Sequence, residues 1–202
     1  MTDRHRAAIA RDKADPVAFG RAILGDTYFP RQAEILSAVR NHPVVAVKGC
    51  PASGKTRAAL GCLPLWWLAR YSEAVCVITA PGMRQVKTGW REIADARSRS
   101  QAAFPEPTTQ QLDITPHRYA VGLATSEAAR FRGCHSPNLL IIVDEAPGLW
   151  RQDIWDEIDG LRAGGNCRLL LLGNPTNPSG RYYDAFTKER ASYHQITVSA
   201  FD

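Results

Sequence analysis

The sequence lacks any hydrophobic run long enough to span a bilayer, and no signal-peptide core follows its first residues. We therefore expect a cytosolic protein without a membrane segment. Internal repeats and low-complexity tracts are also missing. The five cysteines form no C-x-x-C pair and their number is odd, which favours reduced thiols over disulfides or a metal site.

The composition is typical of one globular α/β domain. A chain of 202 residues can bury a sizeable core, and 45% hydrophobic with 22% charged residues are ordinary values for a soluble protein. The net charge of +5, from 25 basic and 20 acidic residues, mildly favours a polyanionic partner. We predict a single domain over residues 1–202, with residues 1–14 as a flexible arm.

The most informative stretch covers residues 44–56. Val44 to Val47 are typical of a strand buried on both faces, and residues 49–56 match G-x-x-x-x-G-K-[ST] at every fixed position. The residues from Arg57 to Leu60 favour a helix. A strand, a glycine-bounded loop and a helix are the context that a phosphate-binding P-loop requires, so a chance match is the weaker interpretation.

The chemistry of phosphate binding explains this spacing. Gly49 and Gly54 allow the backbone to curl so that its N–H groups point at phosphate oxygens. Lys55 would place an ammonium on the β- and γ-phosphates, and the Thr56 hydroxyl suits Mg²⁺. The nucleotide-binding residues predicted in this segment are Gly49, Cys50, Pro51, Ala52, Ser53, Gly54, Lys55, Thr56 and Arg57.

Gln32, 17 residues before Gly49, is a candidate for adenine recognition. A glutamine amide can accept a hydrogen bond from N6 of adenine and donate one to N7 in the same plane. Aromatic Phe29 or Tyr28 could cover the base. The alternative is a surface glutamine that begins a helix.

Polar residues also close two other apolar runs. Asp144 and Glu145 follow Leu139 to Val143, and Asn174 follows the run from Arg168 to Leu172. Ligands of α/β sheets bind at the carboxyl ends of strands, so Asp144 suits a hold on Mg²⁺ and Glu145 suits activation of the attacking water. The Asn174 amide could sense the γ-phosphate or that water. An Asp-Glu turn without a catalytic role is the alternative.

The rest of the chain alternates between predicted helices and strands. We expect helices from Asp15 to about Gly25, after Gln32, over residues 83–98 and after Trp150, strands over residues 74–79 and 194–199, and an antiparallel pair over residues 111–115 and 118–123. Residues predicted on the apolar side of the helix after Trp150 are Trp150, Ile154, Trp155, Ile158 and Leu161.

One predicted helix has a cationic face. Arg84, Lys87 and Arg91 lie at i, i+3 and i+7 of the helix over residues 83–98. This face could follow a phosphate backbone, or it could simply be solvated.

The order of these motifs resembles the ATPase domain of the phage large terminase subunit. The resemblance rests on Gln32, the P-loop, the Asp144-Glu145 strand and Gly173-Asn174-Pro175 followed by Gly180 to Phe186, and it extends from about residue 15 to 199. It implies a three-layer α/β P-loop NTPase of the additional-strand, catalytic-glutamate type, with a mainly parallel central sheet. It also implies Mg²⁺-dependent ATP hydrolysis that powers translocation of double-stranded DNA into a procapsid.

The resemblance assigns roles to individual residues. Gln32 would read adenine, Lys55 and Thr56 would hold phosphate and Mg²⁺, and Asp144 would hold the metal. Glu145 would be the catalytic base, and Asn174 would link hydrolysis to movement. In this family an arginine from a neighbouring subunit completes each site. Arg132 is the first candidate and Arg130 the second, because residues 50–53 of the phosphate loop contain no arginine.

The family also implies partners. They are double-stranded DNA, a portal protein, a small terminase subunit and a nuclease domain or subunit, with a homo-oligomeric ring as the active form in the host cytoplasm. The family's nuclease domain should follow the ATPase, whereas this sequence stops at Asp202, so we expect no DNA cleavage from this chain. A helicase-like DNA translocase and a nucleotide-gated assembly protein without motor activity are the alternatives.

Overall fold

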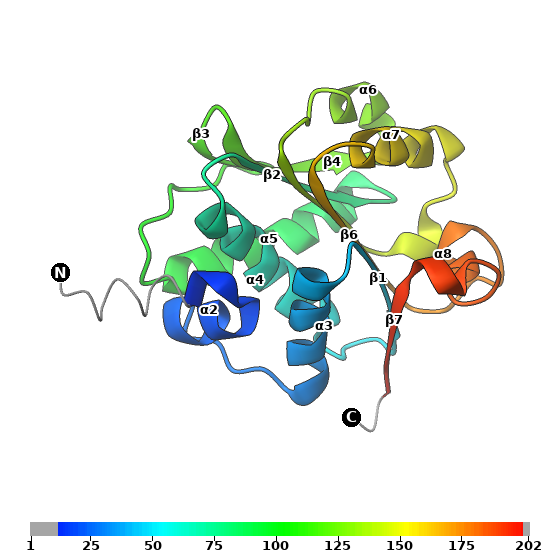
Figure 1. Ribbon diagram of the computed structural model, residues 1–202, viewed down its shortest axis with the longest axis horizontal. Helices are drawn as coiled ribbons and strands as arrows, with labels where there is room; N and C mark the ends of the chain where they lie inside the picture. Colours follow the sequence, from blue (N-terminus) through cyan, green and yellow to red (C-terminus); the bar gives the residue numbers. More distant parts are fainter. Residues whose placement is uncertain (1–11, 200–202) are drawn as a thin grey trace.

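The computed structural model describes residues 12–199, which form one seven-stranded sheet between two layers of helices (Figure 1). The strand order is β3-β4-β2-β5-β6-β1-β7, and each neighbouring pair is parallel except β3 and β4. The strands are β1 (Val44–Gly49), β2 (Ala74–Ala80), β3 (Gln111–Thr115), β4 (Arg118–Ala124), β5 (Asn138–Val143), β6 (Asn166–Gly173) and β7 (His194–Val198).

The helices cover both faces of the sheet. They are α2 (Pro16–Ile23), α3 (Pro30–Asn41), α4 (Lys55–Arg70), α5 (Met83–Arg99), α6 (Ala128–Phe131), α7 (Gln152–Arg162) and α8 (Arg181–Asp184), with 3₁₀ turns η1 (Thr125–Glu127), η2 (Ala146–Gly148) and η3 (Arg190–Ser192). Residues of α2 to α5 pack on one face, and residues of α6 to α8 pack on the other. Within residues 12–199, no helix is both long and apolar enough to cross a membrane.

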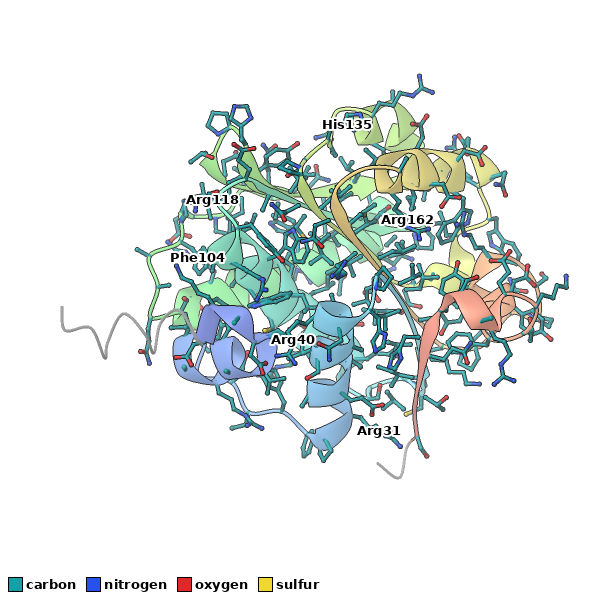
Figure 2. All side chains as sticks on the ribbon, in the orientation of Figure 1. Arg31, Arg40, Phe104, Arg118, His135 and Arg162 are labelled. Atoms are coloured by element: carbon teal, nitrogen blue, oxygen red, sulfur yellow. The ribbon has the colours of Figure 1, made fainter. Side chains whose placement is uncertain are left out.

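Burial on two sides explains why the central strands are apolar at consecutive positions. In β1, Val45 and Val47 pack into the core beneath α2 to α5, whereas Val44 and Ala46 pack into the opposite core. Side chains fill the space between the sheet and both helical layers (Figure 2). A strand that alternated between apolar and polar residues would bury polar groups on one face, so the run of valines predicts a central position.

The strand order places the P-loop strand and the acidic strand on either side of one additional strand. β6 lies between β1 and β5 and is parallel to both. The prediction of a mainly parallel α/β sheet of the additional-strand type is therefore confirmed. Because these three strands run in the same direction, their last residues, Gly49, Val143 and Gly173, lie at one edge of the sheet.

Local predictions were right where capping and strand pairing determine the structure. The Asp15 side chain accepts a hydrogen bond from the Val17 N–H at 2.8 Å and begins α2, as the sequence predicted. Strands β3 and β4 are antiparallel, as expected.

The position of Trp150 was predicted wrongly. It is 63% exposed and precedes α7, whose first residue is Gln152. The helical periodicity therefore does not extend back to Trp150, and Leu149, beside it in the sequence, is buried instead. The other four residues predicted on the apolar side of this helix are buried.

The predicted arm over residues 1–14 lies largely outside the described residues, which begin at residue 12. The part that is described packs on α4. The Lys13 carbonyl accepts a hydrogen bond from Trp66 Nε1 at 2.9 Å, and the Ala14 carbonyl accepts one from Arg70 at 2.7 Å.

Candidate active site

The loop between β1 and α4 has the backbone conformation that anion-binding loops need. Gly54 has φ of 72°, and Ala52 has φ of 60°, which is uncommon for a residue with a Cβ. Gly54 adopts this conformation without steric cost, whereas Ala52 stores strain. Left-handed residues among right-handed ones turn consecutive N–H groups toward the same side. The next residue, Lys55, begins α4, so the positive end of the helix dipole faces this loop.

Lys55 is the central charge of the site. Its side chain is 6% exposed, and its ammonium donates to the Cys50 carbonyl at 3.1 Å and to Asn174 Oδ1 at 2.7 Å. Both of these acceptors are uncharged. A buried ammonium held by neutral oxygens gains considerably when a phosphate oxygen approaches, because the new partner carries a full negative charge.

Asp144 and Thr56 form an oxygen-rich pair beside the loop. Thr56 Oγ1 donates to Asp144 Oδ1 over 3.3 Å, and Asp144 is 6% exposed. Burial and the nearby negative charge of Glu145 raise the pKa of Asp144 to about 6, against the opposing effects of the Thr56 hydroxyl and the Lys55 ammonium. The carboxylate is thus short of positive partners, and two hard oxygen ligands side by side fit Mg²⁺.

Glu145 follows Asp144 in a strained conformation. Its φ of 52° and ψ of 39° lie in the left-handed region, and its N–H donates to Asp144 Oδ1 at 3.1 Å. The residue is exposed, whereas Asp144 is buried. The sharp turn at the end of β5 therefore separates two adjacent carboxylates into a buried one and a solvent-facing one. Backbone strain of this kind is typical of functional positions.

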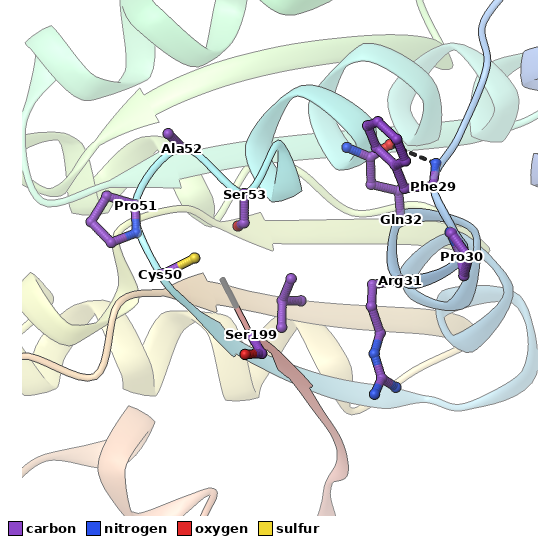
Figure 3. A pocket seen from close by; sticks show the side chains of 10 residues that line it. Phe29, Pro30, Arg31, Gln32, Cys50, Pro51, Ala52, Ser53 and Ser199 are labelled. Carbon is purple, nitrogen blue, oxygen red and sulfur yellow. Dashed lines mark hydrogen bonds between the residues drawn. The ribbon is translucent and has the colours of Figure 1, made fainter. Parts of the chain in front are cut away.

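A cavity of about 560 Å³ lies beside the P-loop (Figure 3). It is lined by Phe29, Pro30, Arg31, Gln32, Cys50, Pro51, Ala52, Ser53, Val198 and Ser199. Phe29 is 73% exposed, so one face of its ring is available to a ligand. The cavity joins the predicted adenine residues to the predicted phosphate residues, although 17 residues separate Gln32 from Gly49 in the sequence.

Gln32 combines the two interpretations that its sequence context left open. Its Oε1 accepts a hydrogen bond from the Phe29 N–H at 3.1 Å, which satisfies the start of α3 (Figure 3). Its Nε2 lies close to Gly54, where a Cβ would collide with it. A carbonyl oxygen has two lone pairs, so Oε1 can cap the helix and still accept from a base. Adenine recognition by Gln32 remains a prediction.

The two candidate arginines lie apart from this cluster. Arg132 forms an ion pair of 2.7 Å with Glu157 on α7, and its side chain is 74% exposed. Arg130 is exposed on α6. Neither is a hydrogen-bond partner of the Lys55 ammonium or of the Asp144 carboxylate, so a role for either one would require a second subunit. Arg57 is exposed on the first turn of α4.

One residue at this edge was missed by the sequence analysis. Tyr182 was placed only on a helix, but its hydroxyl lies 2.9 Å from both the Val47 carbonyl and the Gly173 carbonyl. No local pattern signals this contact, because Val47 is 135 residues away along the chain.

Comparisons with known proteins support this site and fold. No protein-family model matches the chain. Over 66 residues it is 38% identical to the "Probable terminase, large subunit" of Enterobacteria phage P7, a match to 33% of this chain and 12% of that protein. The HK97 bacteriophage large terminase matches with a TM-score of 0.67 and 16% identity, over 93% of this chain and 43% of that chain.

Further solved structures agree. The Thermus phage P74-26 large terminase ATPase domain matches with a TM-score of 0.66 and 15% identity, over 93% of this chain and 87% of that one. A large terminase from a thermophilic bacteriophage, in complex with ADP, has a TM-score of 0.64 and 11% identity, over 86% and 45%. A DEAD box protein from Methanococcus jannaschii matches less well, with a TM-score of 0.53, 12% identity and coverage of 99% and 54%, so a helicase-like translocase is not favoured.

Fold and site together define a P-loop NTPase with an additional strand between the P-loop strand and the acidic strand. More particularly, the chain has the fold of the ATPase domains of phage large terminases, as the sequence resemblance implied. The matched region spans less than half of the HK97 terminase and 12% of the phage P7 relative.

Replacing Gln32 by Glu tests adenine recognition without removing the helix cap. The carboxylate still accepts from the Phe29 N–H but presents a lone pair to N7 of adenine, so the affinity for ADP should fall about tenfold, the equivalent of ~1.4 kcal/mol. The affinity for GDP should change little. Titration calorimetry measures both, with Glu34→Gln on the same helix as the control, and an unchanged ADP affinity would leave Gln32 as a capping residue only.

Proposed function

We propose that this chain is the ATPase domain of a terminase large subunit, which hydrolyses ATP with Mg²⁺ to drive double-stranded DNA into a procapsid. One observation carries the proposal. The buried Lys55 ammonium, the Thr56–Asp144 pair, Glu145 and Asn174 meet at the carboxyl edge of a sheet with the terminase ATPase fold.

Phosphate binding follows from the loop and from Lys55. The N–H groups of the loop and the first turn of α4 would cradle the α- and β-phosphates. Lys55 would exchange one neutral acceptor for a charged phosphate oxygen. Its 2.7 Å contact with Asn174 is the one that must open if the ammonium turns toward the γ-phosphate. Nucleotide binding would thereby release the Asn174 amide, which can then contact the γ-phosphate or the attacking water.

Thr56 and Asp144 are the residues that would hold Mg²⁺. The metal supplies positive charge to the phosphate oxygens as negative charge develops on them. Glu145, exposed and directed away from the buried Asp144, would orient the attacking water and accept its proton. Lys55 stabilises the same developing charge from the loop side.

The proposed partners are those of a packaging motor. The chain would work as a homo-oligomeric ring with a portal protein, a small terminase subunit and a nuclease domain or subunit in the host cytoplasm. Within this ring, Arg132 of one subunit would complete the site of its neighbour. Its 74% exposure and its distance from the subunit's own site are consistent with that role.

Glu145→Gln tests the hydrolytic step. The amide keeps the shape of the side chain but cannot accept the proton, so the ATP turnover rate should fall by a factor of about 10² to 10⁴ while ADP affinity is retained. Steady-state phosphate release measures the rate, and Glu189→Gln, at an exposed glutamate far along the chain, is the matched control. Turnover within a few-fold of the unsubstituted chain would exclude Glu145 as the base.

Arg132→Ala tests completion of the site by a neighbouring subunit. The turnover rate per chain should rise with protein concentration in the unsubstituted chain and should stay low in the variant. Glu157→Gln is the control, because it breaks the same ion pair and keeps the arginine. Mixing Arg132→Ala with Glu145→Gln chains should restore part of the activity, since each supplies what the other lacks. If Glu157→Gln is as inactive as Arg132→Ala, the ion pair is structural.

The cationic face of α5 is the proposed contact for DNA. Arg84, Lys87 and Arg91 are exposed, and none of the ion pairs found among residues 12–199 involves them. The arginines on the last turns of the same helix, Arg97 and Arg99, are bound to acidic side chains. Three uncompensated charges on one face suit a run of phosphates better than a protein surface of mixed charge.

Replacing Arg84, Lys87 and Arg91 together by Gln should weaken DNA binding at every sequence. The slope of log affinity against log salt should decrease by about 0.9 for each phosphate that is no longer neutralised, because fewer counterions are released. Fluorescence anisotropy with duplex DNA at several salt concentrations measures the slope. The control replaces Arg21, Lys188 and Arg190, which are also exposed, and changes the net charge equally. Equal slopes in the two triple variants would contradict a specific role for α5.

A further inference from the structure

Tyr182 occupies a position that the proposed reaction does not yet use. It is the only buried residue of the four-residue helix α8, at 3% exposure, and its ring packs at 5.3 Å against Phe186. Its hydroxyl lies 2.9 Å from the Val47 carbonyl on β1 and 2.9 Å from the Gly173 carbonyl on β6. Burial and the negative charge of Glu145 raise its pKa, so the hydroxyl keeps its proton and acts as a donor.

These two carbonyls mark the points where both strands enter the site. Val47 lies two residues before Gly49, and Gly173 directly precedes Asn174. In the parallel pair of β1 and β6, Val47 is opposite Leu172 and Lys48 is opposite Gly173. The hydroxyl therefore spans the two strands just before one becomes the P-loop and the other becomes the Asn174 segment.

A hydroxyl has one proton and faces two acceptors here. It can donate to the Val47 carbonyl or to the Gly173 carbonyl, but not fully to both. The two arrangements have equal oxygen–oxygen distances, so a small shift between the strands changes which of them is favoured. Removal of the hydroxyl would leave both carbonyls without this donor in a buried environment, at a cost typical of an unpaired polar group.

The space around Gly173 leaves little freedom for such a shift to go unnoticed. A Cβ at Gly173 would collide with Pro147 and would lie 3.2 Å from Cζ of Tyr182. Pro147 lies two residues after Glu145 in the turn η2. The Gly173 backbone is thus enclosed between Tyr182 and the segment that carries Glu145.

The helix that holds Tyr182 is itself anchored to α7. Arg181 forms a two-pronged ion pair with Asp159, with one nitrogen–oxygen distance of 2.7 Å, and its guanidinium lies over the Trp155 ring at 5.0 Å. Since α7 follows the Glu145 turn, Tyr182 connects three parts of the site, the P-loop strand, the Asn174 segment and the helix after the acidic strand.

We propose that Tyr182 is a positioning residue that holds the P-loop strand and the Asn174 segment in register, so that the Lys55–Asn174 contact forms and opens as one unit. This inference rests on the proposed ATPase function. Tyr182 touches no substrate itself and acts through the backbone of Val47 and Gly173.

Tyr182→Phe removes only the hydroxyl and keeps the packed ring. The turnover rate of the full chain should fall about tenfold, equivalent to the loss of one buried hydrogen bond, while the affinity for ADP stays within about twofold. Tyr183→Phe is the matched control, because it removes the hydroxyl of the neighbouring, 38% exposed tyrosine on the same helix. Equal turnover rates in the two variants would overturn the proposal.

A double-mutant cycle with Asn174→Ala separates positioning from general destabilisation. If both residues act on the same contact, Tyr182→Phe should lower turnover less in the Asn174→Ala background than in the unsubstituted chain. Independent, fully multiplying effects would instead mean that Tyr182 only stabilises the fold.

Amide hydrogen exchange of the nucleotide-free chain gives a readout that needs no activity. Exchange over residues 47–50 and 173–176 should be about tenfold faster in Tyr182→Phe than in Tyr183→Phe, since one such hydrogen bond changes the opening equilibrium by about that factor. Unchanged exchange at both segments would overturn the proposal. A chain that neither binds nor hydrolyses ATP while Tyr182→Phe still loosens both segments would instead refute the ATPase function alone.

Discussion

The site depends on a buried ammonium that has no anionic hydrogen-bond partner. Lys55 is held between the Cys50 carbonyl and Asn174 Oδ1, two neutral oxygens at the edge of the sheet. A charge in such surroundings is tolerated only with good hydrogen bonds, and it favours a ligand that brings negative charge. The same contact connects the phosphate loop to the strand that follows the acidic one, so ligand binding and backbone movement share one atom.

Strained backbone surrounds this charge. Ala52 and Glu145 are the non-glycine residues with positive φ among those described, and both lie beside the site. Such conformations persist where packed elements hold them, and here the ends of β1 and β5 are fixed by parallel pairing within the sheet. The arrangement is therefore preformed, with Asp144 buried and Glu145 exposed on consecutive residues.

Much of the fold could be predicted because burial leaves clear traces in a sequence. Apolar runs such as Leu139 to Val143 require two covered faces, and Asp15 before Pro16 begins a helix by local hydrogen bonding alone. Trp150 was misplaced because a large aromatic residue next to a helical pattern was counted as part of it, although the helix starts later. Gln32 could be read either as a cap or as a base reader, and its contacts in the structure are compatible with both.

By itself, the sequence determined which segments are strands, where the phosphate loop lies and which polar residues close each apolar run, because these depend on neighbours within a few positions. Only the tertiary structure decided the strand order, with β6 between β1 and β5, and hence which chain ends meet. Lys55 meets Asn174 across 119 residues, and Tyr182 meets Val47 across 135. Contacts at such separations arise from the packing of the whole sheet, which no local pattern records.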